Sequence, residues 1–206
     1  MVSNYLGFDP GGENKIGVAL FTVGGGQSRC TTGCVASVDH ALKWSVDRLL
    51  DDAPSAVGID TFLFWETGRC GWRPADQWLK ERYVDVRNSV LSSNSASGSM
   101  AVQGMALAIL LRRCWPQVEL IETHPKVLYR ALSGQRYDWS SRMQEWLIEH
   151  MGLAPETVMS DNHCGDAALS AWAAYKGHTR HWKHDLRALS HGPIEPAGSC
   201  AYWWPE

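Results

Sequence analysis

The first 38 residues hold three short segments of apolar and β-branched residues, separated by glycine turns. The segments cover residues 4–9, 15–23 and 29–38. Pro10-Gly11-Gly12 breaks the chain after the first segment, and Gly24-Gly25-Gly26 breaks it after the second. Strands joined by such short turns run antiparallel to one another. The chain is therefore expected to open with a three-stranded antiparallel meander, which excludes an all-helical fold.

Strand-like and helix-like segments alternate after this meander. Short buried strands are predicted over residues 56–60 and 118–122, because each is a brief apolar run. Apolar periodicity, caps and Pro or Gly stops predict helices from Asp39 to before Pro54, over 99–115, from Pro125 to Gly134, from Asp138 to Gly152, and over 162–176 with Gly177 as the stop. This order predicts an α/β fold, a mixed sheet with helices on its faces.

The length of 206 residues suits one domain. We expect residues 1–177 to form it, with residues 62–97 as a long loop or insertion that lacks a clear period. Residues 178–206 are expected to form an irregular C-terminal tail. Apolar residues make up 45% of the chain and charged residues 20%, a balance that excludes wholesale disorder.

Charge and cysteine content narrow the function classes. A formal net charge of −3 excludes a protein that is basic all over, but it allows a local basic groove. The six cysteines form no CxxC pair and no zinc-like spacing, so we expect reduced thiols and a cytoplasmic protein. The most apolar run, residues 105–111, is far shorter than the roughly 20 residues of a membrane span. No membrane partner is expected.

Four acidic residues stand where strands and a helix should meet. Asp9, Asp60 and Glu122 each end a predicted strand, and Asp166 lies in the first turns of the last predicted helix. Charged groups at the ends of apolar strands are costly unless they are paired or bind a cation. Carboxylates that converge in this way suit Mg²⁺ or Mn²⁺, ions that prefer oxygen ligands.

Each acid also has a simpler role open to it. Asp9 precedes Pro-Gly-Gly and could form the turn, and Asp60 could cap a loop. Glu122 could pair with an arginine of the preceding helix, and Asp166 is favourable at a helix N-terminus. The joint placement of the four residues is what favours a functional site.

Two segments resemble RuvC-type resolvases. Residues 5–19, which read Tyr-Leu-Gly-Phe-Asp-Pro-Gly-Gly-Glu-Asn-Lys-Ile-Gly-Val-Ala, resemble the opening strand, turn and second strand of that group. His163-Cys-Gly-Asp166-Ala-Ala resembles its closing helix. Residues 57–60 (Val-Gly-Ile-Asp) and 121–125 (Ile-Glu-Thr-His-Pro), taken with that helix, resemble the family called domain of unknown function 429, whose members are described as predicted RNase H-like nucleases.

The resemblance implies an RNase H-like fold, in which a five-stranded sheet has three antiparallel strands and then two parallel ones. It also implies a metal-dependent nuclease in which Asp9 bridges two ions of Mg²⁺ or Mn²⁺, and Asp60, Glu122 and Asp166 complete their ligands. RuvC-type sites usually carry Glu where this chain has Asp60, whereas RNases H use Asp. His163, one helical turn before Asp166, would face the same site as a ligand or orient the attacking water.

Four cations are expected to contact a nucleic acid substrate: Arg69, Arg73, Arg82 and Lys126. Trp72 and Trp78 lie among them in the sequence and could stack on bases. Asp161 is expected to be the N-cap of the last helix, and His124 to have a structural role. The main alternative to a nuclease is a catalytically inactive scaffold of the same fold that binds nucleic acid or a protein partner. The sequence leaves DNA or RNA, and the oligomeric state, open.

Overall fold

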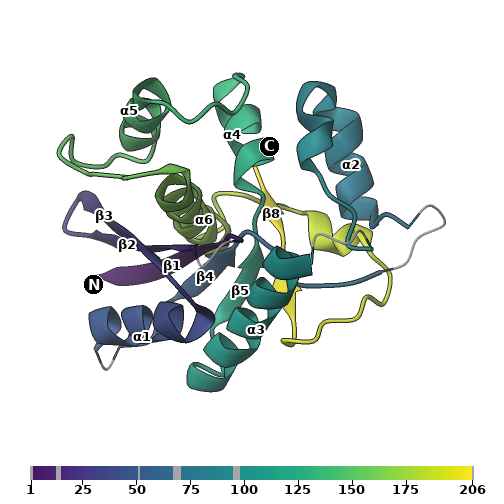
Figure 1. The fold of residues 1–206 in the computed structure, drawn as a ribbon, viewed down its shortest axis with the longest axis horizontal. Helices are drawn as coiled ribbons and strands as arrows, with labels where there is room; N and C mark the ends of the chain where they lie inside the picture. The colour runs from purple at the N-terminus through teal and green to yellow at the C-terminus, as the bar shows by residue number, and fades with distance from the viewer. Residues whose placement is uncertain (1, 13–14, 51, 67–70, 95–97, 206) are drawn as a thin grey trace.

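A six-stranded mixed sheet forms the centre of the computed structural model, which describes residues 2–12, 15–50, 52–66, 71–94 and 98–205 (Figure 1). The strand order is β3-β2-β1-β4-β5-β7. The strands are β1 (Ser3–Pro10), β2 (Ile16–Gly24), β3 (Gln27–Val35), β4 (Ala56–Ile59), β5 (Glu119–Glu122) and β7 (Cys200–Ala201). β1, β2 and β3 pair antiparallel, and β4 and β5 continue the sheet parallel to β1. The expected order of three antiparallel and two parallel strands, that of an RNase H-like fold, is confirmed.

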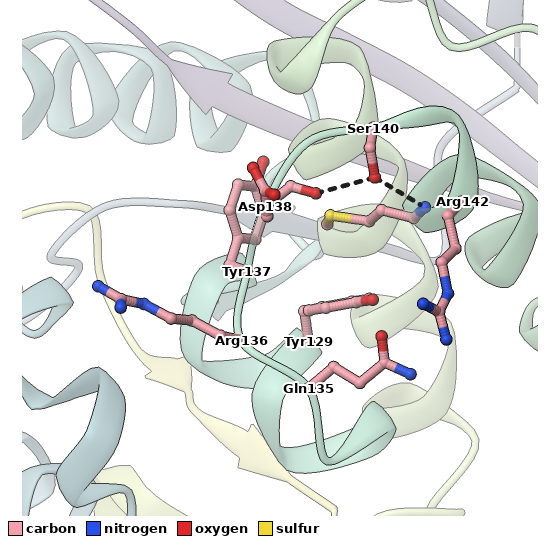
Figure 2. A pocket seen from close by; sticks show the side chains of 8 residues that line it. Tyr129, Gln135, Arg136, Tyr137, Asp138, Ser140 and Arg142 are labelled. Atoms are coloured by element: carbon pink, nitrogen blue, oxygen red, sulfur yellow. Dashed lines mark hydrogen bonds between the residues drawn. The ribbon is translucent and has the colours of Figure 1, made fainter.

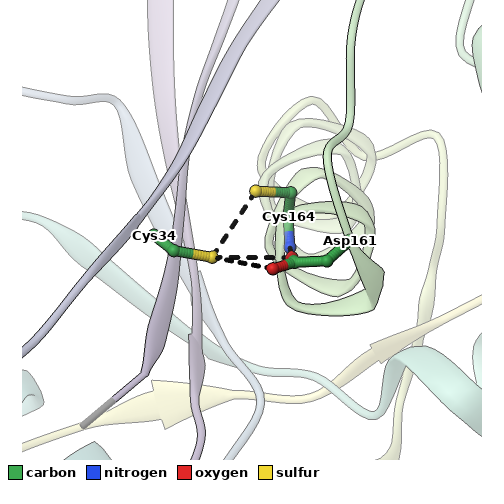
Figure 3. Close-up of side chains that lie close together, drawn as sticks. All are labelled: Cys34, Asp161 and Cys164. Carbon is green, nitrogen blue, oxygen red and sulfur yellow. Dashed lines mark hydrogen bonds between the residues drawn. The ribbon is translucent and has the colours of Figure 1, made fainter.

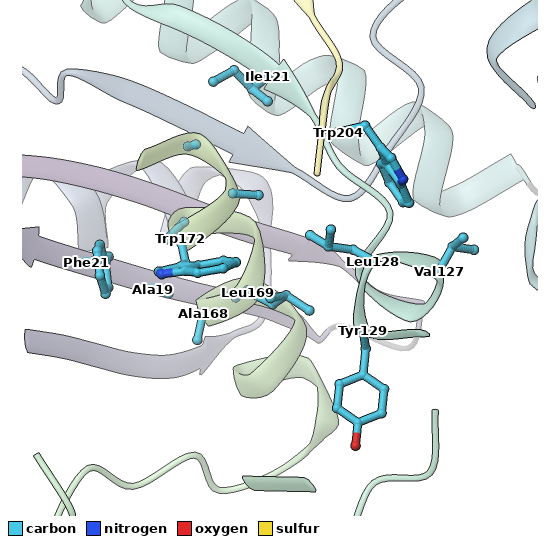
Figure 4. Close-up of a cluster of buried hydrophobic side chains, with 14 of the residues drawn as sticks. Ala19, Phe21, Ile121, Val127, Leu128, Tyr129, Ala168, Leu169, Trp172 and Trp204 are labelled. Atoms are coloured by element: carbon cyan, nitrogen blue, oxygen red, sulfur yellow. The ribbon is translucent and has the colours of Figure 1, made fainter. Parts of the chain in front are cut away.

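Helices cover both faces of the sheet, as predicted. The helices are α1 (Val38–Leu49), α2 (Pro74–Arg82), α3 (Gly98–Cys114), α4 (Pro125–Ser133), α5 (Ser141–His150) and α6 (Asn162–His178). Leu6 of β1 points to the face that α1 and α3 cover. Tyr5, its neighbour, points to the face covered by α6, where α4 and α5 add their own apolar residues (Figure 4). Successive strand residues alternate between faces, so a sheet buried on both sides must be apolar at nearly every position.

Helix α6 lies unusually close to the sheet, because the strands beneath it carry glycines. A Cβ atom at Gly7 would collide with the backbone of α6 at the Ala167 carbonyl, and one at Gly17 with the His163 carbonyl. Gly58 of β4 faces the Ser170 carbonyl in the same way. The helix itself is rich in alanine and is buried along most of its length. This close contact brings the first turns of α6 to the ends of β1 and β4.

Three predicted helix ends were wrong. Ser37, rather than Asp39, caps α1, since its hydroxyl accepts a hydrogen bond from the His40 amide. Ser140, rather than Asp138, caps α5, since its hydroxyl accepts a hydrogen bond from the Met143 amide. Gly177 does not end α6 but lies inside it, where the missing side chain leaves room for the Trp203 ring. Thr179 is the C-cap in its place. At each of these helix ends another residue supplies the cap. Gly177 is a glycine because the Trp203 ring packs against its backbone.

The segment after α6 is more regular than predicted. It holds β6 (His184–Asp185), the 3-10 helix η2 (Leu186–Leu189), β7 and β8 (Trp203–Trp204). β7 pairs with β5 as a sixth strand of the sheet, and β6 pairs with β8. Tyr202 and Trp204 are buried. Aromatic burial and one added strand thus dock this segment, and the domain boundary at residue 177 stays a prediction.

The predicted insertion at 62–97 contains α2 and the 3-10 helix η1 (Val84–Ser89). Ala75, Leu79 and Val86 join the apolar core on the α6 side. Among the described residues, no helix is both long enough and apolar enough to cross a membrane. The five described cysteines are all free, and Cys70 lies outside the described residues.

Candidate metal centre

Three of the four predicted acids come together at the carboxyl ends of β1 and β4. Asp9 is the second-last residue of β1, and Asp60 directly follows β4. Asp166 points to them from the second turn of α6. One carboxylate oxygen of each residue lies within 4.8 Å of the other two. Parallel strands end at the same edge of a sheet, and the glycine contacts of α6 bring the third carboxylate to that edge.

Burial and mutual repulsion make Asp60 and Asp166 hard to ionise. Burial raises the pKa of Asp166 to about 8, and the charge of Asp9 adds to the effect. The pKa of Asp60 is also raised, first by burial and then by the charges of Asp9 and Asp166. Within the described part of the chain, no arginine or lysine forms a salt bridge with any of the three. A site of this kind gains free energy when a cation binds.

Two neighbours hold the acids in place. His163 Nδ1 lies 2.6 Å from Asp9 Oδ2, and this hydrogen bond raises the pKa of His163. The Tyr137 hydroxyl donates to Asp166 Oδ1 at 2.8 Å. The structure therefore places His163 at the site, as predicted. Tyr137 is a site residue that the sequence reasoning missed, because it lies in the irregular segment between α4 and α5 and no motif marks it.

Glu122, the fourth predicted acid, is not part of this group. Its two carboxylate oxygens accept hydrogen bonds from Arg73 Nη2 and Nη1 at 2.6 and 2.9 Å, and one also accepts from the Leu63 amide at 2.8 Å. Asp76 binds the other edge of the same guanidinium. This buried cluster occupies the ligand oxygens of Glu122, so the geometry does not support its expected place among the metal ligands.

The predicted substrate-binding cations differ in burial and in their neighbours. Arg73 is fully buried, with Phe62 and Phe64 packed on its guanidinium, so its burial does not support the expected contact with substrate. Arg82 is exposed and lies over the Trp78 ring at the end of α2.

Lys126 does reach the acids. It is exposed at the start of α4, and its charge acts on both Asp60 and Asp166. Arg69 lies outside the described residues. Of the three predicted cations that the structure describes, Lys126 is the one whose charge acts on the acidic site.

Two surface pockets share Tyr137, the hydrogen-bond partner of Asp166. A pocket of about 300 Å³ is lined by Lys126, Arg136, Tyr137, Trp139 and Asn162, among others. A second pocket, of about 580 Å³, shares Arg136 and Tyr137 with it. Figure 2 shows this second pocket. Lys126 and Arg136 give the smaller pocket two cations, and its Tyr137 hydroxyl donates to Asp166 Oδ1.

His124 lies between the acids and the buried cluster. Burial lowers its pKa to about 4, so the imidazole is neutral. It lines a small cavity of about 80 Å³ with Asp60 and Lys126. Its Nδ1 atom is buried without a hydrogen-bond partner. The structural role expected for His124 stays a prediction.

No family model matches the chain, and a search of curated proteins found no match either. Among solved structures, the chain is similar to RuvC of Thermus thermophilus. The identity is 16%, the match covers 87% of this chain and 97% of that chain, and the TM-score is 0.48. At these values the likeness carries nothing about activity or substrate.

Proposed function

We propose that this protein is a metal-dependent nuclease that hydrolyses phosphodiester bonds of nucleic acid. The observation that carries the proposal is the buried group of Asp9, Asp60 and Asp166, whose ligand oxygens lie within 4.8 Å of one another. No arginine or lysine forms a salt bridge with them in the described part of the chain, and His163 contacts Asp9. The resemblance to RNase H-like nucleases, including the domain-of-unknown-function family, agrees with this function.

The donor set fits Mg²⁺ or Mn²⁺. All three ligands are carboxylates, which these ions prefer, and burial together with neighbouring carboxylates raises the pKa values of Asp60 and Asp166, a cost that a bound cation would relieve. When bound, two such ions would stabilise the attacking and leaving oxygens of a phosphodiester. Arg73 binds the carboxylate of Glu122. Both ions would therefore have to be held by the other three acids, Asp9, Asp60 and Asp166.

The surrounding residues orient the acids and receive the substrate. His163 holds Asp9 by its Nδ1 hydrogen bond, and Tyr137 holds Asp166. Lys126 and Arg136 line a pocket that also contains Tyr137, and we expect them to contact backbone phosphates. Trp139 lines the same pocket and offers a ring on which a base could stack.

Cleavage of a panel of DNA and RNA substrates tests this function. The panel contains single strands, duplexes, hybrids and branched junctions, each assayed with Mg²⁺, Mn²⁺ or EDTA. Asp9→Asn, Asp60→Asn and Asp166→Asn should each lower cleavage by more than about 100-fold, since changes outside the ligand shell already cost about 10–100-fold. Asp47→Asn, an exposed acid on α1, is the matched control and should cleave like the wild type.

The outcomes separate the nuclease from an inactive scaffold. Metal-dependent cleavage that is lost in the three variants and kept in the control supports the proposal. Absence of cleavage, together with no rise in melting temperature on adding Mn²⁺, would favour the inactive scaffold. Cleavage that survives in EDTA or in Asp9→Asn would show that the carboxylates do not carry the reaction.

A further inference from the structure

A second group of ligand atoms lies at the N-terminus of α6, on the side that faces β3. Cys34 Sγ and Cys164 Sγ are 3.6 Å apart, and each oxygen of the Asp161 carboxylate lies 3.5 Å from Cys34 Sγ (Figure 3). The three side chains point toward one another from a strand and from the first turn of the helix. The group is separate from Asp9, Asp60 and Asp166.

These spacings match the edges of a zinc coordination tetrahedron. Zinc binds cysteine sulfur at about 2.3 Å and carboxylate oxygen at about 2.1 Å. In a tetrahedron with those bond lengths, two sulfurs lie about 3.8 Å apart, and a sulfur and an oxygen about 3.6 Å apart. The observed values of 3.6 and 3.5 Å need only small side-chain rotations to accept the ion.

We propose that Cys34, Asp161 and Cys164 bind a thiophilic divalent cation, zinc in the first place. Two thiolates and one carboxylate form a ligand set that prefers zinc to Mg²⁺ or Mn²⁺. Cys34 is exposed and gives the ion a route in from solvent, whereas Cys164 is buried. A solvent molecule takes the fourth position of the tetrahedron.

Neighbouring groups already orient the ligands. The Cys164 amide donates to Asp161 Oδ1 at 3.0 Å, which holds the carboxylate at the end of the helix. The Ser160 hydroxyl lies 3.3 Å from Cys164 Sγ and can donate to a thiolate there. Outer contacts of this kind direct ligands toward a metal and raise its affinity.

Tertiary packing alone brings the two cysteines together, since 130 positions separate them in the sequence. Gly17, which pairs with Cys34 across β2 and β3, lets the His163 backbone lie directly on the sheet. A bound ion would connect β3 to the first turn of α6, which contains His163. It would hold that turn in place at Cys164, two residues before Asp166. The site would be structural, and it stands whether or not the chain is a nuclease.

Cobalt substitution tests the proposal on the reduced full-length protein. Co²⁺ bound through sulfur gives a near-ultraviolet charge-transfer band, whereas Co²⁺ bound to carboxylates alone does not. Titrations run in excess Mg²⁺, so that the carboxylate group is not the preferred site for Co²⁺. We expect one sulfur-bound Co²⁺ per chain, displaced by one equivalent of Zn²⁺, and a melting temperature that rises with Zn²⁺ concentration.

Three variants locate the site. Cys34→Ser should abolish the band, and Asp161→Asn should weaken Co²⁺ affinity by about 10–100-fold, while the asparagine still caps the helix. Cys114→Ser, an exposed cysteine at the end of α3, is the matched control and should keep the band. Far-ultraviolet circular dichroism verifies that each variant is folded.

Clear results would overturn the proposal. A reduced wild-type protein without the charge-transfer band would exclude the site, and so would a band that persists in Cys34→Ser. Formation of a Cys34–Cys164 disulfide in the presence of equimolar Zn²⁺, with no metal retained, would show that the two thiols serve redox chemistry instead. A cleavage assay that fails leaves each of these results unchanged, because none depends on nuclease activity.

Discussion

Removing one buried negative charge should raise the free energy of unfolding of this protein in the absence of metal. It should also make that free energy insensitive to added Mn²⁺. Asp166 is the residue of choice, since the Tyr137 hydroxyl donates to its Oδ1 and an asparagine accepts the same hydrogen bond. The substitution Asp166→Asn therefore keeps the shape and the main contact of the side chain. It removes only the charge and one metal ligand.

The size of the effect follows from the pKa of Asp166, which burial and the charge of Asp9 raise from 3.8 to about 8. Each tenfold change in an acid constant is worth about 1.4 kcal/mol, so the ionised carboxylate costs the folded state about 5–6 kcal/mol. Asparagine is itself a buried polar group and recovers only part of this. We expect a net gain of about 2–4 kcal/mol in the free energy of unfolding at pH 9 in EDTA.

The pH dependence has a definite sign. Between pH 4 and 8 the unfolded chain releases the proton of Asp166 while the folded chain retains it, so the stability of the wild type falls as pH rises. Below about pH 4 the carboxyl is protonated in both states and the cost vanishes. At pH 5 the charge costs the wild type only about 1–2 kcal/mol, which the cost of burying asparagine offsets, so the advantage of Asp166→Asn should vanish there.

Urea denaturation of both proteins at pH 5, 7 and 9, in EDTA and in saturating Mn²⁺, measures the free energy of unfolding and how it depends on pH and metal. Metal at 100 times its dissociation constant should stabilise the wild type by about 2.7 kcal/mol and the variant hardly at all. The exposed-acid variant Asp47→Asn should follow the wild type throughout. An Asp166→Asn protein that is no more stable than the wild type at pH 9, or that gains equally from Mn²⁺, would refute the reasoning.

Two further substitutions probe the parts of the fold that support the site. Arg73→Met should cost about 3–5 kcal/mol of stability, because it leaves buried carboxylates unpaired, and adding Glu122→Leu should recover part of that cost in a double-mutant cycle measured by urea denaturation. Additive effects of the two changes would contradict this coupling. Gly7→Ala should cost about 1–3 kcal/mol or more and weaken Mn²⁺ binding, because its Cβ collides with Ala167, whereas Gly33→Ala meets only ordinary contacts and should melt within a few degrees of the wild type. Equal melting temperatures for the two glycine variants would show that α6 does not depend on the close approach.

Most of the fold could be predicted from local pattern. Glycine turns at residues 10–12 and 24–26 marked the antiparallel meander, and apolar periodicity marked the helices to within a few residues. The tail could not be predicted in this way, because β7 has two residues and exists only through its pairing with β5. Pairings that short carry no periodic signal.

Three of the four acids could be predicted to converge, because strand ends and one helix start are local features and the topology brings them to one edge. Glu122 had the same sequence signal as Asp9 and Asp60, yet Arg73 binds it. Nothing in the sequence around Arg73 indicates a buried side chain, since the segment lacks a clear period. Tyr137 was missed because no motif marks it, and the Cys34–Cys164 contact because 130 positions separate the two residues.

The sequence by itself determined the order of strands and helices, the mixed topology and the acids that end the strands, because periodicity, caps and turns act over a few neighbouring residues. Tertiary structure alone decided which carboxylates gather at the end of β1 and which one pairs with Arg73. It also decided that two cysteines 130 positions apart lie in contact. Such choices depend on how closely α6 packs on glycines of three strands, and the free energy of that contact comes from residues far apart in the chain.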